Sequence, residues 1–216
     1  MTIHAIEDII EDIRQGKMVV MMDDEDRENE GDIVMAAAKV TPWHINFMVR
    51  FARGLVCMPL IKSHCEQLGL GLMVPNSYSN FMANFTVSIE ASQGVTTGIS
   101  AHDRAHTILT AIHPEAKPSD ISQPGHVFPI MAQTEGVFAR QGHTEASIDL
   151  ACLAGHFPAA VICEVLNEDG SMARRPQLEE FVKQHGLKLG TIQSLIDYRK
   201  KREATLKRTS YGFEIA

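Results

Sequence analysis

An acidic run between two apolar stretches constrains the fold of this chain most strongly. Residues 23–32 read DDEDRENEGD and contain seven carboxylates and a single arginine. The flanking stretches, 18–22 (MVVMM) and 33–38 (IVMAAA), are typical of buried strands, so the run is expected to join two strands. Seven like charges repel one another in so short a connection, and a divalent cation would relieve that repulsion. A solvated loop is the alternative, but the position between strands and the Arg27-Glu28 pair favour a binding site.

Composition narrows the class of protein. Of the 216 residues, 44% are hydrophobic and 22% are charged, which is typical of a soluble globular domain with a core. The net charge of -7 argues against a nucleic-acid-binding protein, which would present a basic face.

No apolar stretch is long enough for a membrane span, and the acidic N-terminus does not fit a signal peptide. The four cysteines lack CxxC spacing, which indicates reduced thiols. We therefore expect a cytoplasmic protein without nucleic-acid or membrane partners.

Hydrophobic periodicity and turn signals predict a mixed order of helices and strands. We expect helices at 3–15, 42–53, 63–69, 102–112, 144–155, 176–186 and 191–202. We expect strands at 18–22, 33–38, 55–58, 85–89, 127–130 and 159–166. Residues 114–126 are expected to form a loop, and 75–84 are polar and irregular. This order predicts an α/β (α+β) fold, with a single domain over residues 1–216 and a mixed β-sheet flanked by helices.

The segment RQGHTE at 140–145 is a second candidate site because it precedes the predicted helix. A helix N-terminus presents free backbone N–H groups and a partial positive charge. Gly142 allows close approach of the backbone, Thr144 supplies a hydroxyl, and Arg140 supplies a forked cation that suits phosphate. His143 would then lie beside the bound phosphate. Ordinary capping by Thr144 next to an exposed histidine explains the same spacing.

Two single residues are candidates for proton transfer. His126 lies between a Pro-Gly turn and an apolar stretch, which would hold a general acid or base in place near neutral pH. A structural hydrogen-bonding role is the commoner use of such a histidine. Glu164 interrupts the apolar stretch 160–166, where a buried carboxylate needs a partner or a cation and would suit proton transfer. Exposure of Glu164 on an edge strand is the alternative.

The segment GVTTGISAHDR at 94–104 is rich in glycine and hydroxyl groups. Small residues and hydroxyls of this kind suit a polyol or a phosphate. Taken alone, however, the segment is explained as well by a glycine-rich turn followed by a capped helix.

Long segments of the chain resemble one enzyme family. The stretches at 23–32, 94–104, 118–129 (PSD and PGHVFP), 140–150 (RQGHTEASIDL) and 163–174 (CEVLNEDGSMAR) are similar, in the same order, to 3,4-dihydroxy-2-butanone 4-phosphate synthases. The resemblance covers roughly residues 5–200. It implies a magnesium-dependent lyase of riboflavin biosynthesis, with manganese as an alternative metal. It also implies that the enzyme converts D-ribulose 5-phosphate to L-3,4-dihydroxy-2-butanone 4-phosphate and formate, in a homodimer with its sites at the interface.

The resemblance also implies roles for individual residues. The expected metal ligands are Glu28 and His143, and the other carboxylates of the acidic run suggest two ions per site. The expected catalytic residues are His126 and Glu164, and we add Asp32 as a catalytic residue on the hypothesis that Asp32 or Glu164 moves protons during enolisation. The expected substrate contacts are Arg27, Glu28, Asp32, Arg140, Gln141, Gly142, His143, Thr144 and Glu164. This family is often fused to a GTP cyclohydrolase II domain, for which the chain has no matching segment, so we expect one activity.

Two other functions are open at this point. Another metal-assisted lyase or isomerase of sugar phosphates would use the same enediol step, and the release of formate distinguishes the two. A cation-binding or anion-binding module without catalysis would explain the acidic run and the helix terminus. It would leave Glu164 and the Pro-Gly-His turn unexplained.

Overall fold

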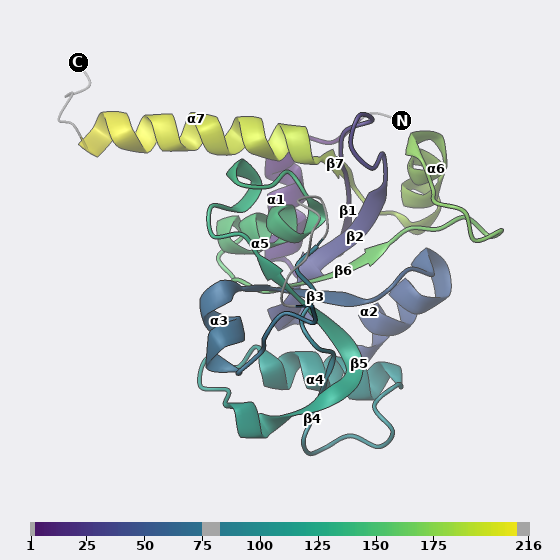
Figure 1. Cartoon of the computed structure of the whole chain (residues 1–216). Helices are drawn as coiled ribbons and strands as arrows, with labels where there is room; N and C mark the ends of the chain where they lie inside the picture. The colour runs from purple at the N-terminus through teal and green to yellow at the C-terminus, as the bar shows by residue number, and fades with distance from the viewer. Residues whose placement is uncertain (1–2, 75–82, 211–216) are drawn as a thin grey trace.

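Seven strands form one mixed sheet in the described part of the chain, in the order β4-β5-β3-β6-β2-β1-β7 (Figure 1). The computed structural model describes residues 3–74 and 83–210, apart from the side chains of 205–210. β1 pairs antiparallel with β2 and parallel with β7, β2 pairs antiparallel with β6, and β3 pairs parallel with β5. The strands are β1 (Val19–Met22), β2 (Gly31–Ala36), β3 (Cys57–Ile61), β4 (Ile89–Ala91), β5 (Ile121–Ala132), β6 (Ala160–Glu164) and β7 (Leu189–Thr191).

Helices cover both faces of the sheet. On one face α1, α5 and α7 pack in one apolar cluster, and on the other face α2, α3, α4 and α6 pack in a second cluster. No helix within the described ranges has both the length and the apolar character needed to cross a bilayer. The helices are α1 (Ile6–Arg14), α2 (Pro42–Phe47), α3 (Lys62–Gln67), α4 (Ala101–Ala111), α5 (His143–Leu153), α6 (Arg175–His185) and α7 (Ile192–Ser210).

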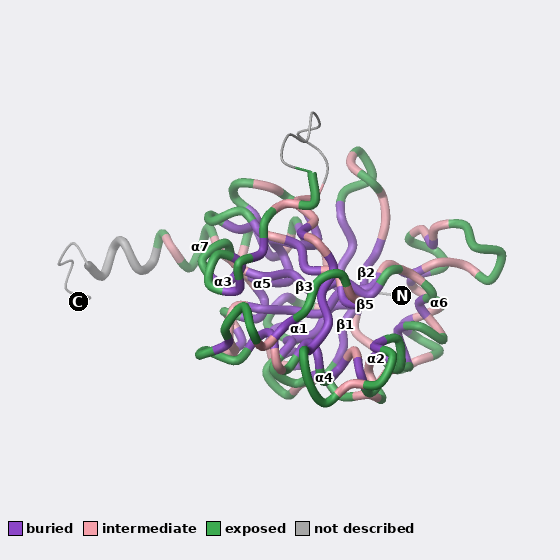
Figure 2. The backbone as a smooth tube through the Cα atoms, turned by 60° about the horizontal axis from the view of Figure 1, so that its bottom comes forward, coloured by how far each residue is buried: buried purple, intermediate pink, exposed green. Residues whose placement is uncertain are grey.

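The apolar stretches on either side of the acidic run supply both cores. Along β1, Val19 and Met21 contribute to the cluster under α1 and α5, while Val20 and Met22 contribute to the cluster under α2 and α6. Successive side chains of a strand point to opposite faces, so a strand covered on both sides needs apolar residues at every position. Figure 2 shows the result: residues of the central strands are mostly buried, and exposed residues lie mostly at the periphery.

The predicted fold class is confirmed, since the chain forms a single mixed α/β domain. Several element boundaries were wrong. β5 starts at Ile121, inside the segment 114–126 that was expected to be a loop. A short edge pairing with β4 orders this polar half of β5, and such pairing leaves no periodic apolar pattern in the sequence. β4 itself starts at Ile89, so the strand expected at 85–89 is mostly absent, although Phe85 and Thr86 form isolated bridges.

Other differences lie at short or extended elements. β7 was missed because its three residues are too few to show a period. The helix predicted at 42–53 is an α-helix only to Phe47 and continues as a π-helical turn over Met48–Ala52. The last helix extends to Ser210, beyond the predicted end at 202. Of the segment 75–84, residues 75–82 lie outside the described residues.

Candidate active site

A cleft of about 410 Å³ opens where the acidic loop, β6 and the start of α5 meet. The acidic loop is the part of the acidic run that connects β1 to β2, residues 23–30. Most of the predicted site residues line it, although Gln141, Gly142 and His126 do not. A hollow of about 470 Å³ between the π-helical turn and α6 contains none of the predicted residues. The residues that line the candidate cleft are Arg27, Glu28, Glu30, Asp32, Ala83, Phe85, Ile130, Arg140, His143, Thr144, Ile162 and Glu164.

Asp23 organises the acidic loop from within. Its buried carboxylate accepts hydrogen bonds from the backbone N–H groups of Glu28 (3.1 Å) and Glu30 (2.8 Å) and from Nη1 of Arg27 (2.7 Å). The loop is therefore folded around one carboxylate and is not a loosely solvated turn. The sequence predicted Asp23 only as one of the further carboxylates of the run and not as the residue that orders the loop. Its position directly after a strand was the available signal, because a short carboxylate there bonds to the following backbone N–H groups.

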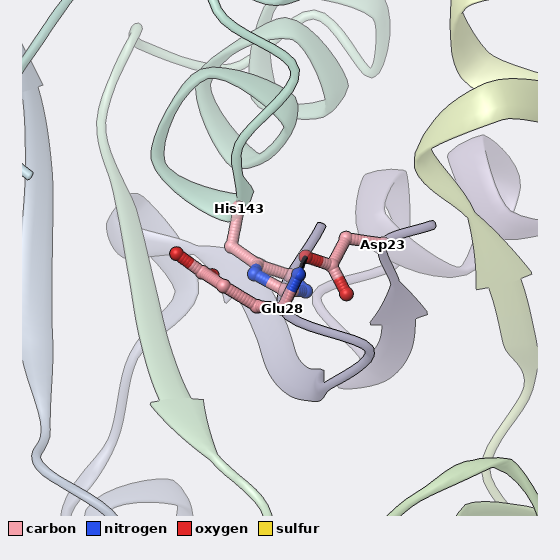
Figure 3. A group of neighbouring side chains, drawn as sticks. All are labelled: Asp23, Glu28 and His143. Atoms are coloured by element: carbon pink, nitrogen blue, oxygen red, sulfur yellow. Dashed lines mark hydrogen bonds between the residues drawn. The ribbon is translucent and has the colours of Figure 1, made fainter. Parts of the chain in front are cut away.

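Glu28, His143 and Asp23 form a group that suits a cation. Their ligand atoms all lie within 4.8 Å of one another, with His143 projecting from the start of α5 toward the loop (Figure 3). Nε2 of His143 is buried and has no hydrogen-bond partner among the described residues. An unpaired buried nitrogen is costly unless a ligand binds it. Asp23 already accepts three hydrogen bonds, so Glu28 and His143 are the better ligands.

Burial also keeps the imidazole in the form that binds metals. Desolvation lowers the pKa of His143 from its ordinary value, so the ring is neutral near pH 7. Carboxylate oxygen and neutral imidazole nitrogen are ligands that Mg²⁺ and Mn²⁺ accept in proteins. The donor set therefore fits the divalent cation that the sequence predicts.

Asp32 and Glu164 form a pair of carboxylates across two neighbouring strands. Asp32 of β2 is directly opposite Glu164 of β6 in the antiparallel register. Burial, and next the charge of Glu164, raise the pKa of Asp32 well above its ordinary value. Oε2 of Glu164 accepts a hydrogen bond from the N–H of Leu55 at 2.8 Å. Glu164 is half-buried at the end of a central strand, so its placement on an edge strand is ruled out. Such a pair can hold and exchange a proton.

The segment 140–145 packs tightly at the start of α5. Nη1 of Arg140 donates to Oε2 of the buried Glu145 at 2.8 Å. A Cβ atom added at Gly142 would lie 2.2 Å from that Nη1 atom, so a larger residue there would displace the guanidinium group. The helix begins at His143, and its N-cap is Gly142. The prediction that Thr144 caps this helix was therefore wrong, because Thr144 lies within the first turn and faces the cleft.

His126 is not brought together with Asp32 and Glu164 within one chain. It lies on β5, where Nδ1 is 2.6 Å from Oε2 of Glu90, and its side chain is 44% exposed. Glu90 is buried and also accepts a hydrogen bond from Thr107 at 3.3 Å. A Cβ atom at Gly98 would collide with the Glu90 carboxylate, so the segment 94–104 packs around this pair. These residues form a second polar cluster at the β4 edge of the sheet.

Comparison with known families identifies the chain. A model of the 3,4-dihydroxy-2-butanone 4-phosphate synthase family matches residues 7–198, which include every residue of the cleft. The chain belongs to this family. The sequence resemblance is thereby confirmed for nearly the whole described chain.

Individual synthases of the family differ in length. The chain is 60% identical to a synthase of Pseudomonas aeruginosa, over 96% of the chain and 57% of that protein. It is 50% identical to a synthase of Agrobacterium fabrum, over 93% of the chain and 94% of that protein. It also resembles the riboflavin biosynthesis protein RibBA of Aquifex aeolicus, with 56% identity over 96% of the chain and 52% of that protein. The chain thus spans little more than half the length of several relatives.

Solved structures of synthases have the same fold. RibBX, a two-domain synthase from A. baumannii, superimposes with a TM-score of 0.88 at 57% identity, over 91% of this chain and 58% of that chain. A synthase in complex with two magnesium ions superimposes with a TM-score of 0.88 at 40% identity, over 93% of this chain and 98% of that chain.

Proposed function

We propose that this chain is a lyase that converts D-ribulose 5-phosphate to L-3,4-dihydroxy-2-butanone 4-phosphate and formate in riboflavin biosynthesis. The observation that carries the proposal is the meeting, in one cleft, of the Glu28–His143 group, the start of α5 and the Asp32–Glu164 pair. Membership of the synthase family supports it. All atoms of the substrate pass to the two products, so the reaction consumes no other reactant.

Glu28 and His143 would hold Mg²⁺, with Mn²⁺ as the alternative. The related synthase in complex with two magnesium ions supports two ions per site, and Glu30 supplies a further carboxylate in the same cleft. A bound divalent cation would stabilise the negative charge that develops on the sugar oxygens during enolisation.

The remaining cleft residues would bind the substrate and move its protons. Arg140 and the positive end of α5 suit the phosphate group. Asp32, with its raised pKa, is suited to take a proton from a sugar carbon, and Glu164 is its partner in sharing that proton. Arg27 bonds to Asp23 and Glu28, so it would reach the substrate from within the loop. The apolar side chains of Phe85, Ile130 and Ile162 line the same cleft and would limit the water around a bound substrate.

Release of formate tests this function directly. Purified protein with ribulose 5-phosphate and Mg²⁺ should produce one formate for each sugar phosphate consumed, and chelation of the metal should stop the reaction. Consumption of the substrate without formate would indicate a different isomerase or lyase. No turnover, with Mg²⁺ binding retained, would indicate a binding module.

We also propose that the protein is a homodimer in which His126 acts in the cleft of the second subunit. His126 does not line the cleft of its own chain, yet its side chain is 44% exposed and its Nδ1 is held by the buried Glu90. A carboxylate that fixes one ring nitrogen leaves the other free to exchange a proton with substrate. The dimer expected from the resemblance would bring this ring to a site at the subunit interface.

Mixed dimers test the role of His126. The homodimers of His126→Ala and of Asp32→Asn should each be nearly inactive. After the two chains are unfolded and refolded together, about a quarter of the sites should regain activity, because half of the dimers are mixed and each has one unaltered site. A mixture of Asp32→Asn and Glu164→Gln is the control and should regain nothing, since both residues line the same cleft. Absence of recovery in the first mixture would contradict the proposal.

A further inference from the structure

Arg174 joins the start of α6 to the acidic loop, although it lies 146 residues after Glu28 in the sequence. Its Nη1 atom donates hydrogen bonds to the carbonyl oxygens of Glu28 (2.5 Å) and Asn29 (2.6 Å). The same atom is 3.7 Å from Oε1 of Glu30. One guanidinium group therefore contacts three consecutive residues of the loop, and bonds from a charged donor are stronger than those between neutral groups.

The loop has a conformation that needs external support. Asn29 has a φ of 54°, in the left-handed region that residues other than glycine rarely adopt. The carboxylate of Asp23 binds the N–H groups of Glu28 and Glu30, while Arg174 binds the carbonyl groups of Glu28 and Asn29. Both peptide groups beside Asn29 are thus held. The orientation of these two peptide groups determines the direction in which the Glu28 side chain leaves the backbone.

Arg174 is itself held by a rigid element. It is the N-cap of α6, and its N–H donates to Oε1 of Gln177 at 3.1 Å. Leu178 of α6 packs against Gly31 of β2, where an added Cβ atom would lie 2.5 Å from Cδ1 of Leu178. The side chain of Leu178 therefore packs directly on the residue that follows the acidic loop, which keeps α6 close to that loop. The guanidinium group of Arg174 thus reaches the acidic loop from α6, an element distant from the loop in the sequence.

We propose that Arg174 is a positioning residue of the metal site, which keeps the acidic loop in the conformation that sets Glu28 beside His143. Arg174 does not line the cleft and is not among the ligand group of Glu28, His143 and Asp23. Its effect is therefore exerted through the loop backbone. The proposal rests on the proposed function only in taking Glu28 as a metal ligand.

The test compares two neighbouring arginines. Arg174→Gln removes the charged donor, and Arg175→Gln is the matched control, because Arg175 pairs with Glu179 one turn along α6. In calorimetry with Mg²⁺ alone, Arg174→Gln should bind about 10 to 100 times more weakly than the wild type, the usual effect of losing a partner behind a metal ligand. Arg175→Gln should bind as the wild type does. Arg174→Lys should recover part of the affinity, since an ammonium group can donate to a carbonyl.

Hydrogen exchange gives a second readout that does not depend on the metal. In Arg174→Gln without Mg²⁺, the amides of Glu28 and Glu30, which bond to Asp23, should exchange about tenfold faster or more. Core amides of β1 and β2 should keep their rates. Wild-type Mg²⁺ affinity and unchanged loop exchange in Arg174→Gln would overturn the proposal. So would a general loss of protection across the chain, which would indicate a merely structural role. If the wild type releases no formate, the proposed function fails, while both comparisons still decide the role of Arg174.

Discussion

Glu28→Gln should lower kcat/KM for formate release by about 10³-fold and abolish measurable Mg²⁺ binding. Glutamine keeps the length of the side chain and an oxygen that can accept from Nη1 of Arg27, which is 2.7 Å from Glu28 in the wild type. It removes only the negative charge that attracts the cation. Loss of a cation that stabilises charge in the transition state costs several kcal/mol, and about 4 kcal/mol corresponds to 10³-fold in rate. Formate assays and calorimetry measure the two effects.

His143→Ala should have the same two effects, because Nε2 of His143 is the buried atom that lacks a partner in the described residues. If both side chains bind one ion, the double variant should be little worse than either single variant. Glu25→Gln is the control, since it removes an equal charge from an exposed position of the same loop that does not line the cleft. Wild-type Mg²⁺ affinity in both Glu28→Gln and His143→Ala would contradict this assignment.

The sequence predicted best the parts of the structure whose signals are local. β1, β2 and β6 were placed to within about two residues because both of their faces are buried, which leaves continuous apolar stretches. The polar start of β5 and the three residues of β7 have no such pattern. Asp32 was assigned to the acidic run because it is polar and precedes the apolar stretch 33–38, although it is the second residue of β2.

The sequence predicted which residues belong to the candidate site. It did not predict the hydrogen bonds and the strand register that hold these residues in place. The buried carboxylate of Asp23 and the cap residue Arg174 act through hydrogen bonds to loop backbone, which no spacing of residues reveals. The pairing of Asp32 with Glu164 depends on the register between β2 and β6, and these strands are more than a hundred residues apart. The partner of His126, Glu90, was not foreseen, because it sits on a three-residue strand.

Asp32→Asn should lower kcat by about 10² to 10⁴-fold, which is the usual contribution of a general acid or base. Asparagine has nearly the same shape but cannot accept the proton. Mg²⁺ binding should persist if Glu28 and His143 are the main ligands, so calorimetry separates this variant from the metal-site variants. The rate at which substrate hydrogen exchanges for solvent deuterium should fall by the same factor as kcat. Normal exchange in Asp32→Asn would show that another group removes the proton.

The like charge of Glu164 makes a further prediction about pH. In the wild type, burial and Glu164 raise the pKa of Asp32, so the acid limb of the pH–rate profile should lie above the ordinary range of an aspartate. Glu164→Gln removes one negative neighbour, which makes loss of the proton from Asp32 easier and lowers its pKa. The acid limb of the residual activity should therefore move to lower pH. A shift to higher pH would contradict the assignment of Asp32 as the base.

The same raised pKa predicts that the Asp32→Asn protein is more stable than the wild type without metal. The folded state holds the proton of Asp32 more tightly than the unfolded state, so the wild type loses stability as the pH rises from the unfolded pKa, near 4, through the folded pKa. Asparagine carries no charge and avoids this loss. The melting temperature of Asp32→Asn should exceed that of the wild type by about 2 °C or more at pH 8, and the difference should shrink toward pH 4. A variant that loses activity while it gains stability would mark Asp32 as a carboxylate kept for chemistry at a cost to the fold.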